Sequence, residues 1–360
     1  MRRRGVSREH VGGGSSVMYL LLDAMRRQRG RLLDLMGFGP QETPCRIVAE
    51  QPGMRLRAYQ AAASRAPVVL IIPAPFKRGY IWDLRPEVSV VRRCQAAGLA
   101  VFMLEWTDPA PGDDLGLADY ADRLPLAAAE AIGRTAGEGP IVLAGHSLGG
   151  TFAAIFAALH PEQVRDLWLI DAPLVFGPDS GDRLADLLRA IDPAWLAAAA
   201  GEPVAGSFIT ALAVAALPDE FLLTPAADFV ACGWDADRQR LRMQVLRWTQ
   251  DEFPLPTRLF LDIAESLYRQ DRLAEGSLAL SPGVVGLSDL RTPTAAVLNP
   301  ASAVAPAAAT ARGLERAPAP VSTFIYEPRP GCALTHVGPL VSPSAHALIW
   351  PRLIRRAAGA

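Results

Sequence analysis

A short box around one serine carries the clearest chemical meaning in the sequence. Residues 145–149 read GHSLG and lie between the apolar run 141–144 and a helical pattern at 151–159. A G-x-S-x-G box between a strand and a helix forms a sharp turn that exposes the serine hydroxyl at the strand end. Since a serine hydroxyl can attack an acyl carbon once a base takes its proton, Ser147 is predicted to be the nucleophile of an acyl-transfer reaction.

The serine needs a histidine base on a loop at the same sheet edge. His336 follows the last predicted strand by a loop and is therefore the predicted base. The other four histidines lie in the N-terminal tail, in the box, at the end of the helix after it and in the terminal helix: His10, His146, His160 and His346.

The third catalytic residue departs from the usual order of serine, acid and histidine, in which the acid follows the strand at 295–298. Residues 290–314 contain no carboxylate, whereas Asp171 directly follows the strand at 167–170. We predict Asp171 as the acid that orients the imidazole. Three alternatives stay open: Glu327, an amide contact from Asn299, or no orienting group.

The oxyanion of such a reaction needs two backbone donors. One is the amide of Leu148, after the nucleophile, and the other comes from the loop after the strand at 68–72. That loop reads PAPFKR, and because proline has no N–H, Phe76 or Ala74 is expected to supply the second amide. Lys77 in the same loop is either a contact for a substrate carboxylate or phosphate, or a solvated lysine.

The elements around these residues alternate between strands and helices. A hairpin is predicted at 47–50 and 56–59, and further strands at 68–72, 100–105, 141–144, 167–170, 295–298 and 323–326. Several are apolar without alternation, as expected for strands covered on both faces. The pattern predicts an α/β fold with a doubly wound, mostly parallel sheet.

More than a hundred residues separate the strand at 167–170 from the strand at 295–298, too many for one crossover. We expect a helical cap inserted there, followed by a return helix at 259–268. The predicted organisation is a mobile tail at 1–17, an N-terminal helical segment at 18–44, a first core part at 45–175, the cap at 176–254 and a second core part at 255–360.

The segment 18–36 places leucines and methionines at helical spacing, with arginines between them. Packing of this amphipathic helix on its own domain is the favoured interpretation. The alternative is contact with a polymer granule or a membrane surface.

Composition narrows the classes of function. The 360 residues carry 36 basic and 37 acidic side chains, so no overall charge attracts nucleic acid or an anionic membrane surface. No apolar stretch is long enough to span a membrane. The four cysteines are far apart, without disulfide or metal-site spacing. We expect a cytoplasmic enzyme without metal or cofactor, and the oligomeric state stays open.

Several segments resemble the polyhydroxyalkanoate synthase family. They are PAPFKRGYIWDLRPE at 73–87, LRWTQD at 246–251 and His336-Val337-Gly338, within a similarity that covers most of 45–340. The resemblance implies an α/β-hydrolase fold with an inserted cap and a hydroxyacyl substrate.

Three positions depart from that family. Its nucleophilic cysteine is Ser147 here, its asparagine is Lys77, and its aspartate aligns with Ser302. Repeated acyl exchange from thioesters suits a thiolate better than a serine. We therefore expect a serine esterase or acyl hydrolase that acts on carboxylic ester or thioester bonds, such as 3-hydroxyacyl esters or oligomers. The alternatives are a synthase-like acyltransferase that uses serine, and a non-catalytic member that binds an acyl ligand, a granule or a synthase.

Overall fold

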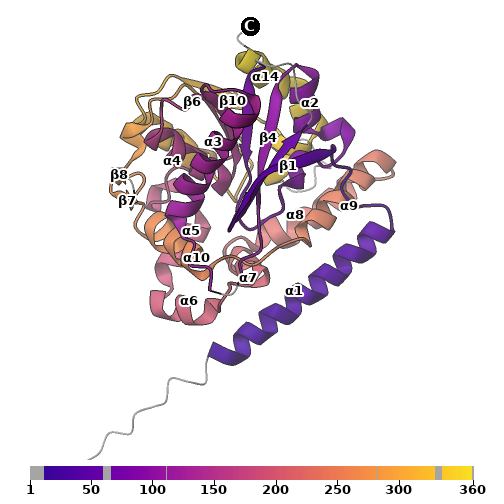
Figure 1. The fold of residues 1–360 in the computed structure, drawn as a ribbon. Coiled ribbons are helices and arrows are strands. Elements are labelled where there is room, and N and C mark those ends of the chain that lie inside the picture. Colours follow the sequence, from indigo (N-terminus) through magenta and orange to yellow (C-terminus); the bar gives the residue numbers. More distant parts are fainter. Residues whose placement is uncertain (1–11, 60–65, 111, 282, 329–334, 359–360) are drawn as a thin grey trace, which may run out of the picture.

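The computed structural model describes residues 12–59, 66–110, 112–281, 283–328 and 335–358. Within them, an eight-stranded sheet has the order β1-β2-β4-β3-β5-β6-β9-β10 (Figure 1). Its strands are β1 (Cys45–Gln51), β2 (Met54–Tyr59), β3 (Val68–Ile72), β4 (Ala100–Trp106), β5 (Ile141–His146), β6 (Val164–Ile170), β9 (Thr294–Leu298) and β10 (Val321–Ile325). All eight strands predicted from the sequence are present. A separate antiparallel pair, which the sequence did not indicate, comprises β7 (Leu278–Leu280) and β8 (Gly283–Val285).

The sheet is antiparallel only where β2 pairs with β1 and β4, and the pairs from β4 through to β10 are parallel. Side chains of β3 alternate between two buried clusters: Leu70 and Ile72 enter one, Val69 and Ile71 the other. Because each face of the sheet has its own apolar core, the central strands carry apolar residues at every position. The predicted doubly wound α/β sheet is confirmed.

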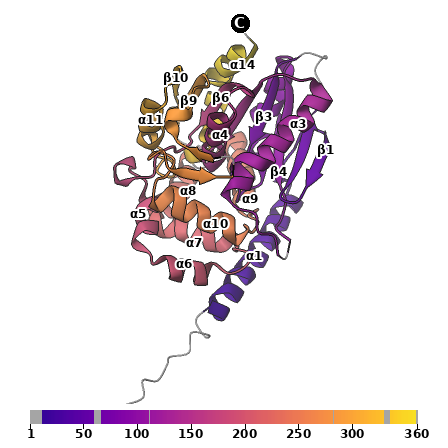
Figure 2. The ribbon, with the colours of Figure 1, turned by 60° about the vertical axis from the view of Figure 1, so that its left-hand side comes forward.

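Helices cover both faces of the sheet (Figure 2). Those of the core are α2 (Val90–Ala96), α3 (Leu124–Ala136), α4 (Leu148–Leu159), α11 (Ala307–Arg316), α12 (Gly338–Val341), α13 (Pro343–Leu348) and α14 (Trp350–Ala358). Residues of α3 and α4 belong to the same cluster as Leu70, whereas residues of α2 and α14 belong to the cluster of Val69.

The long connection between β6 and β9 is mostly helical and lies below the sheet in Figure 1. Its helices are α5 (Arg183–Ala190), α6 (Pro193–Ala200), α7 (Gly206–Ala216), α8 (Thr224–Cys232), α9 (Ala236–Thr249) and α10 (Thr257–Asp262). A π-helical turn, Asp219–Leu223, leads into α8, and another, Ile263–Arg269, extends α10. The helices occupy the segment expected to form a cap and its return helix, while the exact domain boundaries stay a prediction.

The N-terminal helix α1 (Gly12–Leu35) corrects two expectations. It begins at Gly12, inside the predicted tail, of which residues 1–11 lie outside the described part. It does pack on its own chain, against α6, α7 and α9. However, the face turned inward is largely polar: Asp23 and Gly30 are buried, whereas Leu21 and Leu32 are exposed. Polar contacts therefore contribute to holding α1 on the chain.

Interactions at several points attach α1 along its length. The buried carboxylate of Asp23 accepts a hydrogen bond from the backbone N–H of Ser207, at 2.8 Å. The guanidinium of Arg247 donates to both carboxylate oxygens of Asp34, at 2.7 and 2.9 Å. Near the other end, the ring of Tyr19 meets that of Phe208 edge-on.

No single helix in the described part of the chain has the length and apolar character needed to cross a bilayer. One strongly bent pair, Gly206–Ala216 with Asp219–Cys232, satisfies those criteria only when the two helices are taken together.

Replacing Asp23 with alanine is expected to lower the free energy of unfolding by about 1–3 kcal/mol, because the buried N–H of Ser207 loses its acceptor. Urea unfolding followed by circular dichroism measures the change. The exposed Glu138 supplies the control, since Glu138→Ala is expected to change stability by less than about 0.5 kcal/mol. Equal stabilities of the two variants would contradict this account of α1.

Candidate active site

Ser147 occupies a strained turn between β5 and α4. Its φ is 55°, a value that residues with a Cβ rarely adopt, and the residue is 8% exposed. The turn also brings backbone segments close together: a Cβ on Gly149 would collide with the carbonyl oxygen of Ile72, and one on Gly145 with Gly149. The two glycines of the box are therefore required by space, and together they fix where the serine lies.

His336 and Asp171 are in contact although 165 residues separate them. His336 Nδ1 lies 2.9 Å from Asp171 Oδ2, and Ser302 Oγ approaches the same nitrogen at 3.3 Å. Both His336 and Ser147 line one cavity. Since Nδ1 faces Asp171, Nε2 is the ring nitrogen left to accept a proton from the cavity side.

Asp171 directly follows β6, with a positive φ of 46° and 1% exposure. Burial raises the pKa of its carboxyl group, while the nearby His146 and hydrogen bonds from Ser302 and Asn299 act to lower it. Burial lowers the pKa of the His336 imidazole. A neutral imidazole is the form that can act as a base.

The other acids and amides considered from the sequence are placed differently. Glu327 is exposed and follows the end of β10. Asn299 is buried, and its side chain hydrogen-bonds Asp171 and accepts from the backbone N–H of Ala301. Asn299 is thus a neighbour of the carboxyl group, and Asp171 itself contacts the imidazole.

His146 has a position that sequence reasoning did not assign. Its Nε2 donates to the backbone carbonyl of His336 at 2.9 Å, and the two imidazole rings lie 4.5 Å apart between centroids. Burial lowers the pKa of His146 to about 3. Its position beside Ser147 in the sequence could have indicated a place in the site. Its contact with a loop 190 residues away becomes visible only in the folded chain.

The remaining described histidines lie elsewhere. His160 ends α4 and contacts Asp122 at 2.6 Å, and His346 in α13 hydrogen-bonds the carbonyl of Leu340. His10 lies outside the described residues.

The loop after β3 lines the cavity together with Leu148, the first residue of α4. The N–H groups of a first helical turn have no partner within the helix, so the Leu148 amide can serve an oxyanion. Ala74 and Phe76, the two candidates for the second donor, both line the cavity. The residues predicted to supply the oxyanion donors thus line one cavity.

Lys77 lies in the same loop, but its side chain is bound by residues at and after the end of α9. Its ammonium pairs with the buried carboxylate of Glu252 and approaches the carbonyl of Thr249 at 3.3 Å. Arg26 of α1 reaches the same carboxylate at 3.4 Å. Burial lowers the pKa of Lys77, whereas Glu252 raises it. Any anionic substrate group would have to compete with Glu252 for this cation.

The cavity has a volume of about 600 Å³. Ser147, His336 and the loop after β3 line it, and most of its wall is apolar. The helices between β6 and β9 supply much of that wall: Leu184, Leu188, Ile209, Leu212, Leu217, Phe260, Ile263 and Tyr268. An apolar cavity with a few polar groups at one end fits a ligand with an acyl chain and a polar reacting centre.

His146, Asp171 and His336 also offer ligand atoms that lie within 4.8 Å of one another, as a metal site would. However, His336 Nδ1 contacts Asp171, and His146 Nε2 donates to the carbonyl of His336. Two of the potential ligand nitrogens are therefore engaged in hydrogen bonds.

Comparison with known families agrees with the fold. Residues 13–229 match the family described as alpha/beta hydrolase fold. The chain belongs to this family.

Among individual relatives, the poly(3-hydroxyalkanoate) polymerase subunit PhaC of Haloferax mediterranei is 28% identical over 86% of this chain and 63% of its own length. PhaC of Haloarcula marismortui is 33% identical over 43% of this chain and 34% of its own length. The similarity to polyhydroxyalkanoate synthases seen in the sequence is confirmed. The chain spans less than two thirds of the length of these relatives.

Solved structures show the same fold. A structure from a study of carboxylesterases of Nitrososphaera gargenis superposes with a TM-score of 0.52 at 14% identity, covering 88% of this chain and 99% of that one. An alpha/beta hydrolase fold protein from Nakamurella multipartita gives 0.50 at 17% identity, with 88% and 100% coverage.

The imidazole of His146 is expected to stay neutral from pH 7 down to pH 5, because burial lowers its pKa to about 3 and protonation starts only as the pH approaches that value. An NMR titration, with the ring signal assigned by its loss in His146→Gln, measures this. The urea-unfolded chain is the control and should titrate near 6.5. A midpoint near 6.5 in the folded protein would contradict the burial of this ring.

Proposed function

We propose that the protein is a serine hydrolase that cleaves carboxylic ester or thioester bonds through an acyl-enzyme on Ser147. The observation that carries this proposal is the convergence of Ser147, at its strained turn, with the His336–Asp171 pair in one cavity. A nucleophile, a base and a group that orients the base are the three parts that activation of a serine requires.

In the first half of the proposed reaction, Ser147 Oγ bonds to the substrate carbonyl carbon while its proton passes to Nε2 of His336. The negative charge on the carbonyl oxygen faces the amide of Leu148 and that of Phe76 or Ala74. The intermediate collapses, the bond from carbon to the leaving oxygen or sulfur breaks, and His336 returns the proton to the leaving group. Water then repeats these steps and releases the acid and free Ser147.

Asp171 fixes the orientation of the base in this mechanism. Its contact with Nδ1 holds Nε2 toward the cavity, and its negative charge stabilises the imidazolium formed during attack. Ser302 lies close to the same nitrogen but carries no charge. The acid of this chain would thus act from the end of β6, with Ser302 at the position that the synthase resemblance assigns to an aspartate.

The proposed substrates are 3-hydroxyacyl esters or oligomers. Two observations support this class: the apolar cavity of about 600 Å³, and relatives named as poly(3-hydroxyalkanoate) polymerase subunits. The cap helices would enclose the acyl chain, and the polar groups near Ser147 would hold the ester.

The same relatives favour a second candidate, acyl transfer to a hydroxyacyl acceptor in place of water. Both candidates share the acyl-enzyme and differ in what accepts the acyl group. Analysis of the products from a 3-hydroxyacyl thioester separates them: free hydroxy acid indicates hydrolysis, and chains of two or more units indicate transfer. A non-catalytic acyl-binding protein would form neither product.

Wild-type protein is expected to react covalently with a fluorophosphonate probe and to hydrolyse p-nitrophenyl esters. Ser147→Ala should lose labelling and reduce turnover by on the order of 10³-fold or more, because the nucleophile is absent. The exposed Ser288 gives a matched control, and Ser288→Ala should behave as wild type. Labelling that persists in Ser147→Ala would refute the assigned nucleophile.

Asp171→Asn is expected to reduce kcat by on the order of 10³-fold or more, because an amide favours the wrong imidazole tautomer and cannot stabilise the imidazolium. Adding Ser302→Asp should restore part of this loss, since Ser302 Oγ lies 3.3 Å from His336 Nδ1. Steady-state kinetics on folded protein, with Tm measured in parallel, tests both. An unchanged kcat with a lowered Tm would leave Asp171 only a structural role.

A further inference from the structure

The outward face of α1 is apolar although nothing in the described chain covers it. Leu21 is 61% exposed and Leu32 is 58% exposed. Exposed apolar residues of α1 and of the position after it share one side of the helix, with a polar interruption at Gln28: Val17, Met18, Leu21, Met25, Leu32, Leu35 and Met36. This spacing places them in one stripe, opposite the polar face that contacts the cap helices.

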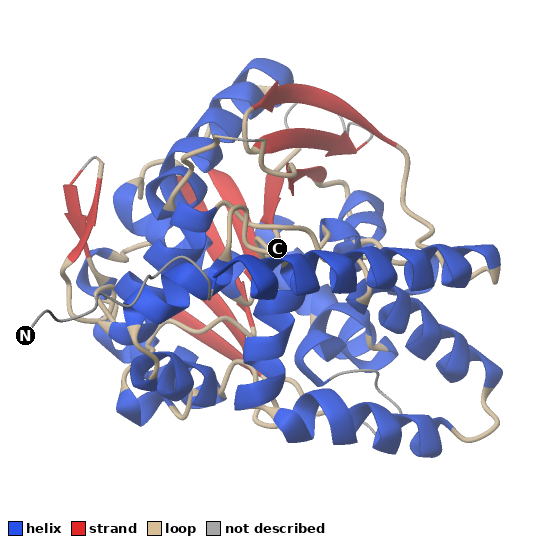
Figure 3. Ribbon diagram, turned by 90° about the horizontal axis from the view of Figure 1, so that it is seen from below, coloured by secondary structure: helices blue, strands red, loops and turns tan. Residues whose placement is uncertain are grey.

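A second apolar group lies on the cap, in α8 and the π-helical turn before it. Its exposed members are Leu222, Leu223, Phe229 and Val230. Viewed from below, α1 crosses the near face of the molecule with cap helices beside it (Figure 3). We call the stripe of α1 and this second group the lower face. It includes residues from α1, from α8 and from the turn before α8.

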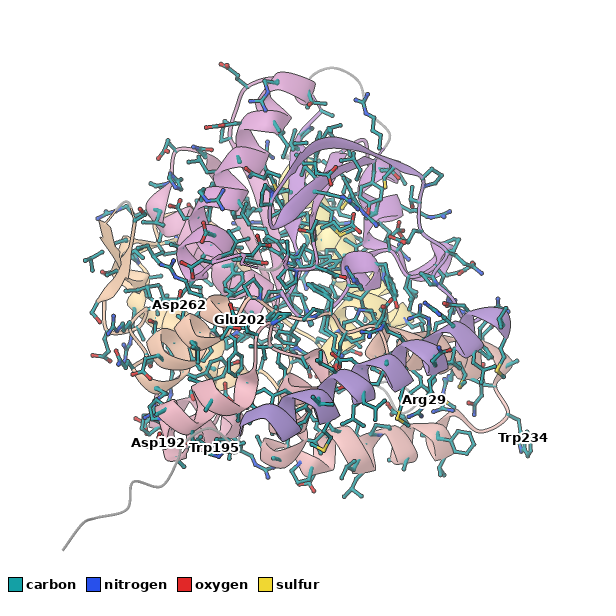
Figure 4. All side chains as sticks on the ribbon, turned by 60° about the horizontal axis from the view of Figure 1, so that its bottom comes forward. Arg29, Asp192, Trp195, Glu202, Trp234 and Asp262 are labelled. Atoms are coloured by element: carbon teal, nitrogen blue, oxygen red, sulfur yellow. The ribbon has the colours of Figure 1, made fainter. Side chains whose placement is uncertain are left out.

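Aromatic side chains stand on the same side of the molecule. Trp195 lies near one end of α1 and Trp234 near the other, with Arg29 between them (Figure 4). Both tryptophans are exposed. Tryptophan is enriched where proteins meet the boundary between lipid headgroups and acyl chains.

The charges that flank the apolar stripe of α1 are positive. Arg27, Arg29 and Arg31 are exposed, and none forms an ion pair with any residue in the described ranges. The two acids of α1 are already engaged, Asp23 by a backbone N–H and Asp34 by Arg247. The uncompensated charge of this helix therefore suits an anionic surface.

The cavity above Ser147 reaches the lower face. Arg29 of α1 and Leu222 of the π-helical turn both line the cavity, and both are exposed. Both α1 and the turn before α8 thus contribute exposed residues to the cavity wall, and we place its mouth between them. A lipid surface in contact with both apolar groups would bring its acyl chains to this mouth.

We propose that the lower face docks the protein on an anionic lipid bilayer, with the cavity mouth turned toward the acyl chains. The apolar stripe enters the boundary between headgroups and chains, and Arg27, Arg29 and Arg31 meet the phosphates. The breadth of the apolar surface, its basic flank and its continuity with the cavity favour a planar anionic surface over a single partner helix. The docking does not require the proposed catalytic residues.

Flotation with vesicles tests the docking. Wild-type protein should float with vesicles of equal parts phosphatidylglycerol and phosphatidylcholine about tenfold more than with phosphatidylcholine alone, and less at high salt. Leu21→Gln/Leu32→Gln should reduce binding about tenfold or more, since both side chains leave the lipid. Arg27→Gln/Arg31→Gln should weaken binding to the anionic vesicles only.

Two controls accompany these variants. Leu348 is 62% exposed in α13, away from α1, so Leu348→Gln should float as wild type. Ser147→Ala should also float as wild type, which separates failure of the docking from failure of the proposed chemistry.

Four results would overturn the proposal. The first is no flotation of wild type with the anionic vesicles. The second is flotation of Leu21→Gln/Leu32→Gln at the wild-type level. The third comes from light scattering without lipid: a wild-type dimer that this double variant splits would identify a second copy of the chain as the partner of the stripe. Adsorption to polyester particles without binding to vesicles would likewise replace the bilayer with a polymer surface.

Discussion

The contact between Asp171 and His336 is the constraint on which the candidate site depends. It joins the residue after β6 to a loop beyond β10, so β6, β9 and β10 must lie side by side in parallel for it to form. Both residues are largely removed from water, which opposes a free charge on either one. Their mutual contact compensates for the lost contact with water, and the strand order of the sheet brings the two residues together.

The environment of this pair extends across the nucleophile turn. His146 precedes Ser147 in the chain and donates a hydrogen bond to the backbone carbonyl of His336. It therefore connects the nucleophile turn to the loop of the base. Below them, Glu252 connects three parts of the molecule: Lys77 of the loop after β3, Arg26 of α1 and its own segment after α9. A displacement of α1 would thus alter, through Glu252, the contacts of the loop that carries a proposed oxyanion donor. The N-terminal helix and the reacting centre belong to one network of contacts.

The sequence predicted the structure correctly where a residue pattern is compatible with only one local conformation or environment. Strands buried on both faces must be apolar throughout, so central strands such as β3, β5 and β9 were predictable from their composition. The GHSLG box has few geometric solutions between a strand and a helix, and Asp171 followed from the common edge of parallel strands. The sequence could not predict which face of α1 would be buried. Spacing shows that its leucines share a face, but the opposite face is fixed by distant partners, Ser207 for Asp23 and Arg247 for Asp34. The role of His146 was hidden for the same reason.

The central claim is that Ser147 carries the acyl group during turnover. Acid quenching during hydrolysis of a p-nitrophenyl 3-hydroxyacyl ester, followed by mass spectrometry of the intact protein and its peptides, tests it directly. Our account predicts one hydroxyacyl adduct, located on the peptide that contains Ser147, and a larger adduct fraction when hydrolysis of the acyl-enzyme limits turnover. Product release with an adduct located on a different residue would contradict it.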